Sequence, residues 1–276
     1  MNIKELDTLD QTCVKNNDLI SLFNPEYQKI IQDKIEILKN HYLASVKRDG
    51  YELRFVPMEL RTPEICLAAV KQSGSALEFV PKELKTPEIC LTAVKENGWS
   101  LDYVPKEHQT PELCLTTVQH EGCALYYVPE ELKTPEICLA AVQQYGCALD
   151  YVPKEHQTPE ICLAAVKQHG CALQYVPEEL KIPEICLVAV QQEGCSLEHV
   201  PKEHQTPEIC LAAVRKNGRA LYIVPKELQT PELCLAAVSR VKNNFHYIQL
   251  SQPVIKNNIK YTFNKKNKSV LIEYIA

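Results

Sequence analysis

Every glycine in this chain falls at the same phase of a 24-residue period. The eight positions are Gly50, Gly74, Gly98, Gly122, Gly146, Gly170, Gly194 and Gly218. Because glycine tolerates a left-handed backbone at little cost, its confinement to one position predicts that the chain makes the same turn once in every period. Self-similarity at this period is typical of repeat architectures, so both fold and function have to be read from the repeated unit.

Each repeat begins with signals for a helix. Counted from Thr62, one unit reads T-P-E-I-C-L-A-A-V-K-Q-S-G-S-A-L-E-F-V-P-K-E-L-K. Thr62 suits a helix cap and Pro63 suits the first helical position. Glu64 complements the positive end of the helix dipole, and Gly74 marks the helix end. The unit returns at Thr86, Thr110, Thr134, Thr158, Ile182, Thr206 and Thr230.

The second half of the unit carries Leu77, Phe79 and Val80 before Pro81. The proline rules out a long uninterrupted helix, so we predict a short helix or a 3₁₀ turn and favour both over a short strand. A 24-residue unit is too short to fold alone, which means that stacked units must supply the core. The predicted fold class is all-α, a right-handed α-solenoid of helix, turn and short-helix repeats with a cap at each end.

The ends of the chain depart from the repeat, as the end units of a solenoid do. Residues 1–61 are expected to form an N-terminal helical cap that includes a degenerate repeat, with a helix that starts at Asn24 and Pro25. Residues 62–252 form the array of eight repeats, and residues 253–276 form a basic C-terminal cap. For this last segment we favour two helices over a hairpin across residues 264–268.

The array is also expected to extend beyond its last clear unit. Phe245, Tyr247 and Ile248 continue the pattern of the second half-unit, although Lys242 stands where a glycine is expected. Residues 240–276 contain seven Lys and Arg against one Glu, about +6, which leaves about −11 on the rest of a chain whose net charge is −5. The basic end can contact phosphates or acidic lipids, but we favour a solvated cap that resists end-to-end stacking.

Cysteines follow the period in two columns. Neighbouring layers of a helical stack lie about 8–10 Å apart, which is too far for the 4.4–6.8 Å Cα separation of a disulfide. We therefore predict buried, reduced thiols at the fifth repeat position, and packing residues rather than oxidised ones in a second, partly exposed column after the glycine. The first column is Cys66, Cys90, Cys114, Cys138, Cys162, Cys186, Cys210 and Cys234, and the second is Cys123, Cys147, Cys171 and Cys195.

Neither the spacing of the histidines nor the motifs of the sequence indicate a metal site or a catalytic site. His108, His156 and His204 recur every 48 residues, two layers or about 16–20 Å apart, so duplication of a two-repeat block explains them better than a shared metal. No C-x-x-C pair, glycine-rich phosphate loop or nucleophile elbow is present. We expect no metal, no cofactor and no catalytic residue, and the alternative that stays open is an active site in the cap regions.

Three columns vary freely between repeats: the residue before the glycine, the residue after it, and the residue three positions further on. Aromatic and arginine side chains there add contact area with few rotatable bonds to fix, which suits a protein-binding surface. Neutral drift at solvated positions explains the same variation equally well. The candidate partner-binding residues are Tyr51, Trp99, Tyr126, Tyr145, His169, Arg219 and Tyr222.

The unit T-P-E-I-C-L-A-A-V-K-x-x-G-x-A-L-E-Y-V-P-x-E-L resembles the short repeats of domain of unknown function 4116, and the similarity spans residues 42–247. The resemblance implies tandem helical repeats of the kind found in proteins of intracellular bacteria, including Legionella-type secreted effectors, and of giant viruses. Family units often stay helical where this chain has Val152-Pro153, so the length of the second helix stays open. The family supplies no catalytic residues to transfer.

Two classes of function remain. The favoured one is a non-catalytic repeat scaffold for protein–protein interaction, including a secreted effector that acts on a host protein. The alternative is a nucleic-acid or acidic-membrane binder that works through the basic C-terminal end, but the acidic array argues against a surface that tracks phosphates. We expect a monomer with an unidentified protein partner, in the cytoplasm or delivered by a non-Sec route into a host cytosol, rather than a disulfide-bonded extracellular protein.

Overall fold

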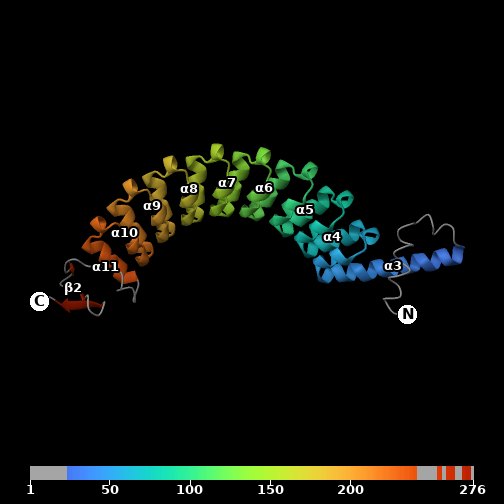
Figure 1. The fold of residues 1–276 in the computed structure, drawn as a ribbon, viewed down its shortest axis with the longest axis horizontal. Coiled ribbons are helices and arrows are strands. Elements are labelled where there is room, and N and C mark those ends of the chain that lie inside the picture. The colour runs from blue at the N-terminus through green and yellow to red at the C-terminus, as the bar shows by residue number, and fades with distance from the viewer. Residues whose placement is uncertain (1–23, 241–253, 257–258, 265–268, 275–276) are drawn as a thin grey trace. The chain divides into compact units, whose positions relative to one another are not determined.

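The computed structural model describes residues 24–240, 254–256, 259–264 and 269–274 (Figure 1). In these ranges the chain is a solenoid of consecutive helical repeats, followed by a small antiparallel sheet. Contacts divide the chain into two units, Met1–Leu132 and Lys133–Ala276. Inside each unit the α-helix of one repeat packs against the α-helix of the next, which confirms the predicted all-α repeat architecture. The boundaries after residues 61 and 252 stay predictions.

Each repeat contains one α-helix, a 3₁₀ helix of about two turns and a shorter 3₁₀ turn, so the prediction for the second half-unit is confirmed. The α-helices are α3 (Pro25–Arg48), α4 (Pro63–Gln72), α5 (Pro87–Glu96), α6 (Pro111–His120), α7 (Pro135–Gln144), α8 (Pro159–Gln168), α9 (Pro183–Gln192), α10 (Pro207–Lys216) and α11 (Pro231–Arg240).

The longer 3₁₀ helices all begin at the repeat glycine. They are η1 (Gly50–Phe55), η3 (Gly74–Phe79), η5 (Gly98–Tyr103), η7 (Gly122–Tyr127), η9 (Gly146–Tyr151), η11 (Gly170–Tyr175), η13 (Gly194–His199) and η15 (Gly218–Tyr222). The shorter ones follow the second proline of the unit. They are η2 (Met58–Leu60), η4 (Lys82–Leu84), η6 (Lys106–His108), η8 (Glu130–Leu132), η10 (Lys154–His156), η12 (Glu178–Leu180), η14 (Lys202–His204) and η16 (Lys226–Leu228).

The predicted helix starts are confirmed by the cap geometry. Thr62 Oγ1 accepts a hydrogen bond from the Ile65 backbone N–H at 3.3 Å, and the threonine in six further repeats caps its helix in the same way. In α3, Asn24 Oδ1 accepts from the Tyr27 N–H at 3.0 Å, as expected for the N-terminal cap. Ile182 occupies the same position before α9 and makes no side-chain cap bond.

Replacing Ile182 with threonine should therefore stabilise the repeat that begins there. The backbone at Ile182 already has the extended geometry of the other caps, with φ −66° and ψ 157°, so the new hydroxyl can accept from the Ile185 N–H without rearrangement. An added cap bond contributes about 1 kcal/mol. Amide hydrogen exchange at Ile185 and thermal unfolding measure the gain, and Thr158→Ile should give the opposite change. Unchanged exchange at Ile185 in the Ile182→Thr variant would contradict the cap argument.

The repeat glycine serves close packing rather than a left-handed turn, so the sequence-based reason for it is wrong. The residue before it is extended, as at His169 with φ −140°, and the glycine itself opens a 3₁₀ helix. A Cβ built on Gly170 would lie 2.4 Å from the carbonyl oxygen of Ala189 in the next repeat. No left-handed φ occurs at the glycines compared in this way, Gly50, Gly74, Gly98, Gly146, Gly170 and Gly194.

The core is formed by the same positions in each repeat. In the repeat of α8, Ile161, Cys162 and Ala165 are buried on the helix, and Leu173 is fully buried on η11. Burial of a side chain such as Leu173 stabilises the fold by about 1.5–3 kcal/mol. All eight cysteines at the fifth position are buried, and none of these eight forms a disulfide, as predicted.

The side chain of the last residue of the unit donates to backbone carbonyl oxygens in several repeats. Gln109 Nε2 donates to the carbonyl oxygens of Leu101 and Val104 within its own repeat, at 3.2 and 2.9 Å. Lys85 Nζ instead reaches into the following repeat and donates to the Tyr103 carbonyl oxygen at 2.8 Å. Glutamine and lysine at this position therefore satisfy carbonyls at the end of a 3₁₀ helix in two different ways.

The C-terminal segment forms strands, so the preference for two helices is wrong and the hairpin alternative is right. The strands are β1 (Val254–Lys256), β2 (Ile259–Asn264) and β3 (Ser269–Tyr274). They pair antiparallel in the order β1-β2-β3, with Asn264 opposite Ser269 at the hairpin. The short apolar run in β3 fits either a helix or a strand, and alternation in Lys260-Tyr261-Thr262-Phe263 decides for the sheet. Lys242, Phe245, Tyr247 and Ile248 lie outside the described residues.

Candidate functional site

An aromatic cluster lies on two consecutive 3₁₀ helices of the first unit. Trp99 is the second residue of η5, while Tyr126 and Tyr127 end η7. The Trp99 ring meets Tyr127 edge-on with centroids 5.5 Å apart, and Tyr126 meets Tyr127 at 4.9 Å. Trp99 and Tyr126 remain 43% and 59% exposed, so both rings are accessible to a partner. The cluster joins two of the predicted partner-binding residues into one aromatic surface.

A carboxylate from the next repeat contacts this surface. The Trp99 indole N–H donates to Glu121 Oε1, and Glu121 Oε2 accepts from the Gly98 N–H at 3.0 Å. Glu121 thus holds the indole ring in one orientation from the next repeat. Elsewhere in the same unit, the nearby charge of Glu78 is the main cause that raises the pKa of Tyr103. Glu121 is therefore a carboxylate in direct contact with the aromatic cluster.

The other predicted residues lie in the same three variable columns of other repeats. Tyr51 meets Phe79 edge-on at 6.3 Å in the first unit, and Tyr145 meets His169 at 5.6 Å in the second. Arg219 and Tyr222 are both exposed on η15, where residues three apart lie one above the other. Each of these pairs therefore belongs to one repeat or to two consecutive repeats.

Tyr127 was missed by the sequence analysis, although it links Trp99 to Tyr126. It belongs to a column that is aromatic in most repeats and is therefore not one of the three variable columns. In the structure this column is mostly half-buried, and its rings can support the variable residue of the preceding repeat, as Phe79 supports Tyr51. The spacing of 28 residues between Trp99 and Tyr127 was the signal that could have identified the pair.

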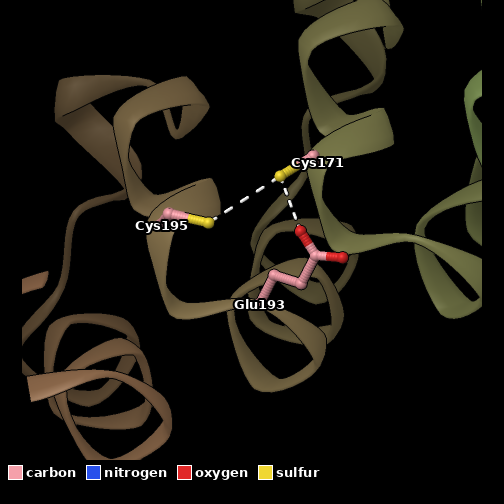
Figure 2. Close-up of side chains that lie close together, drawn as sticks. All are labelled: Cys171, Glu193 and Cys195. Atoms are coloured by element: carbon pink, nitrogen blue, oxygen red, sulfur yellow. Dashed lines mark hydrogen bonds between the residues drawn. The ribbon is translucent and has the colours of Figure 1, made fainter.

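A second cluster lies in the second unit and combines two thiols with a carboxylate (Figure 2). Cys171 follows the glycine of η11, Cys195 follows the glycine of η13, and Glu193 precedes that second glycine. Cys171 Sγ donates to Glu193 Oε2 at 2.6 Å and lies 3.7 Å from Cys195 Sγ. The three ligand atoms lie within 4.8 Å of one another. Both thiols are free, in line with the prediction of no disulfide, but layer spacing does not keep the sulfurs apart because the side chains lean toward each other across the layers.

The electrostatics of this cluster disfavour a free thiolate. Burial, followed by hydrogen bonds to Glu193 and Cys195, raises the pKa of the Cys171 thiol to about 12. Cys171 is therefore a protonated thiol at neutral pH rather than an activated nucleophile. His169 Nε2 lies 3.9 Å from Glu193 Oε1, the carboxylate oxygen that does not accept from Cys171 Sγ.

The histidines of the 48-residue pattern lie apart from this cluster. His108, His156 and His204 each end a short 3₁₀ turn and are half-buried. His108 lines a hollow of about 310 Å³ together with Leu91, Lys95 and Thr116. Within the described residues, the only group of three or more ligand side chains close enough for one metal ion is Cys171, Glu193 and Cys195.

Comparison with known families identifies the repeat. The family model described as Domain of unknown function (DUF4116) matches the chain in seven overlapping segments that together cover residues 42–229. The chain belongs to this family. The matched segments are residues 42–85, 62–109, 86–133, 110–157, 134–181, 158–205 and 182–229. No curated protein and no solved structure is detectably similar to it.

Each DUF4116 match spans about two of the 24-residue units, since successive matches advance by one unit and overlap by another. The Trp99 cluster and the Cys171 cluster both lie inside the matched region and both use side chains from two consecutive units. Neither cluster can form within a single repeat. In the described part of the chain, no helix has the length and apolar character required to span a membrane.

Proposed function

We propose that this DUF4116 protein is a non-catalytic scaffold that binds a protein partner through the Trp99 cluster. The observation that supports it is the contiguous aromatic surface of Trp99, Tyr126 and Tyr127, whose rings contact each other edge-on and remain partly exposed. Exposed Trp and Tyr side chains held in one orientation bind partners with little further loss of conformational entropy. The 3₁₀ helices beneath them are anchored by the buried core.

The charges around the cluster favour a basic partner segment. Glu121 lies against Trp99, and Glu78 and Asp102 lie near Tyr103 in the same unit. An arginine or lysine side chain can stack on an indole or phenol ring while its charge faces these carboxylates. A reducing cytosol, in the producing cell or in a host cell reached by a non-Sec route, is the compartment we propose. The buried free thiols, such as Cys162, favour it.

The double variant Trp99→Ser/Tyr126→Ser tests the proposed function. Loss of one aromatic hot spot costs about 2 kcal/mol, or about 30-fold in affinity, so the double variant should lose partner binding by at least that factor. Affinity capture from a host-like lysate with the intact protein and the variant, followed by quantitative mass spectrometry, compares the two. Titration with the partner so identified then gives the ratio of dissociation constants.

Ile37→Ser is the matched control, because Ile37 is 63% exposed on α3 and belongs to neither cluster. Circular dichroism should show equal helicity and equal thermal unfolding for both variants. Partner capture that survives the double variant would contradict the proposal. Capture that depends instead on residues after about 250 and weakens steeply with salt would favour the basic C-terminal end as the binding element.

A further inference from the structure

The cysteine cluster of the second unit has the composition of a metal site. Cys171, Glu193 and Cys195 supply two thiols and one carboxylate from two consecutive repeats, with all three ligand atoms within 4.8 Å. Figure 2 shows both sulfurs pointing into the space between η11 and η13, with the Glu193 carboxylate beneath Cys171. We propose that these residues bind a zinc ion that joins the two repeats.

The separation of the sulfurs favours a metal ion over a disulfide. Two sulfurs bound to one tetrahedral zinc at about 2.3 Å lie about 3.8 Å apart, and the sulfurs of Cys171 and Cys195 lie 3.7 Å apart. A disulfide requires about 2.05 Å, well below the separation of these two sulfurs. For zinc binding, the 2.6 Å distance between Cys171 Sγ and Glu193 Oε2 has to lengthen by about 1 Å once the thiols lose their protons to solvent.

The ligand set matches zinc in chemical character. Thiolate ligands select soft or borderline cations, whereas magnesium and calcium take oxygen ligands. Cys171 and Glu193 are partly buried and Cys195 is exposed, so the site is accessible to an ion and keeps a position open for water. His169, 3.9 Å from Glu193 Oε1, lies where it can orient the carboxylate from behind.

The first unit provides a natural comparison. Trp99, Glu121 and Cys123 occupy the positions that correspond to Cys171, Glu193 and Cys195. There the carboxylate accepts from the indole N–H, and Cys123 Sγ lies 3.6 Å from Glu121 Oε1. A tryptophan in place of the first thiol removes one ligand and fills the space for the ion. The two clusters therefore differ in one side chain. The cluster that has cysteine at this position offers two thiols to a metal ion, and the cluster that has tryptophan offers one.

Titration of the full-length, chelator-treated and reduced protein with Co²⁺ and Zn²⁺ tests the site. We expect one equivalent of Co²⁺ to give a thiolate-to-cobalt charge-transfer band that Zn²⁺ displaces. Cys171→Ser and Cys195→Ser should each abolish the band, and Glu193→Gln should weaken Zn²⁺ binding about tenfold or more. Cys123→Ser, in the same column of the first unit, should leave the band unchanged. No band, or a band that persists in Cys171→Ser/Cys195→Ser, would overturn the assignment.

A gain of binding provides a second, independent test. Trp99→Cys places a thiol beside Glu121 and Cys123 and should raise the stoichiometry from one to two equivalents of Co²⁺. The result does not depend on partner binding, so it is distinguishable from a failure of the proposed scaffold function. A stoichiometry that stays at one would show that the geometry between consecutive repeats does not define the site, and the assignment would fail.

Discussion

Gly170→Ala is expected to destabilise the second unit by about 3 kcal/mol, the upper part of the usual range for overpacking. The new methyl group would lie 2.4 Å from the Ala189 carbonyl oxygen and 2.9 Å from both the backbone N and Cβ of Glu193. These are mostly backbone atoms, which cannot rotate away. The repeats on either side must therefore move apart and lose contact in the core around Leu173.

Urea unfolding and hydrogen exchange across α8 and α9 measure this loss. Because stability in a repeat protein is a sum of units and interfaces, the effect should be concentrated at the interface that contains Gly170. Lys167→Ala, on the exposed face of α8, should change stability by less than about 0.5 kcal/mol. Wild-type stability in Gly170→Ala would show that the close approach between repeats is not required.

Arg61→Met is expected to destabilise the first unit by about 3 kcal/mol. The guanidinium donates to three carbonyl oxygens, those of Val56 at 2.9 Å, Phe79 at 2.5 Å and Arg54 at 3.3 Å. Two of them belong to its own repeat and one to the next. Methionine keeps much of the length of the side chain but leaves these acceptors without a charged donor.

The matched variant Arg61→Gln separates the stability that comes from hydrogen bonds within the repeat from the stability that comes from the hydrogen bond to the next repeat. Glutamine fills the same position at Gln109, where it donates to the carbonyls of Leu101 and Val104 in its own repeat. Arg61→Gln should therefore recover about half of the loss, and Arg61→Met should show the full effect in chemical denaturation. Equal stability of Arg61→Met and the wild type would indicate that water replaces the guanidinium at all three carbonyls.

The repeat, its period and its helix starts could be predicted because local chemistry determines them. Thr62 and Pro63 cap and start α4 regardless of what surrounds the helix, and the same two signals recur in most units. The burial of the fifth-position cysteines could be predicted because their neighbours in the sequence are apolar. Ile182 shows the complementary case, since the helix of its repeat forms without the cap because packing supplies the stability.

The sequence-based predictions that did not hold depend on distances between repeats. The glycine was assigned a left-handed turn because only its own backbone was considered, whereas the approach of the Ala189 carbonyl explains it. The distance argument for cysteines used layer spacing at the backbone, but the sulfurs of Cys171 and Cys195 extend toward each other from those layers. Both errors concern where side chains of one repeat meet the next, which a single unit does not encode.

The residues of the aromatic cluster were predicted from the sequence only in part. Trp99 and Tyr126 were selected as exposed variable residues, but the contact between them depends on Tyr127, which does not belong to a variable column. The strands at the C-terminal end show a related limit, because Val270, Leu271 and Ile272 form a run of apolar residues that both a helix and a strand tolerate.

The residue after each glycine lies in the first turn of a 3₁₀ helix whose backbone is the same from repeat to repeat. Trp99 and Cys171 stand at this one position, where the first contributes to an aromatic surface and the second to a group of metal ligands. The buried residues of the unit do not have to change for this exchange. A change of this one residue therefore alters what a repeat can form together with its neighbour, and the surface can be redesigned one pair of repeats at a time without changing the buried residues.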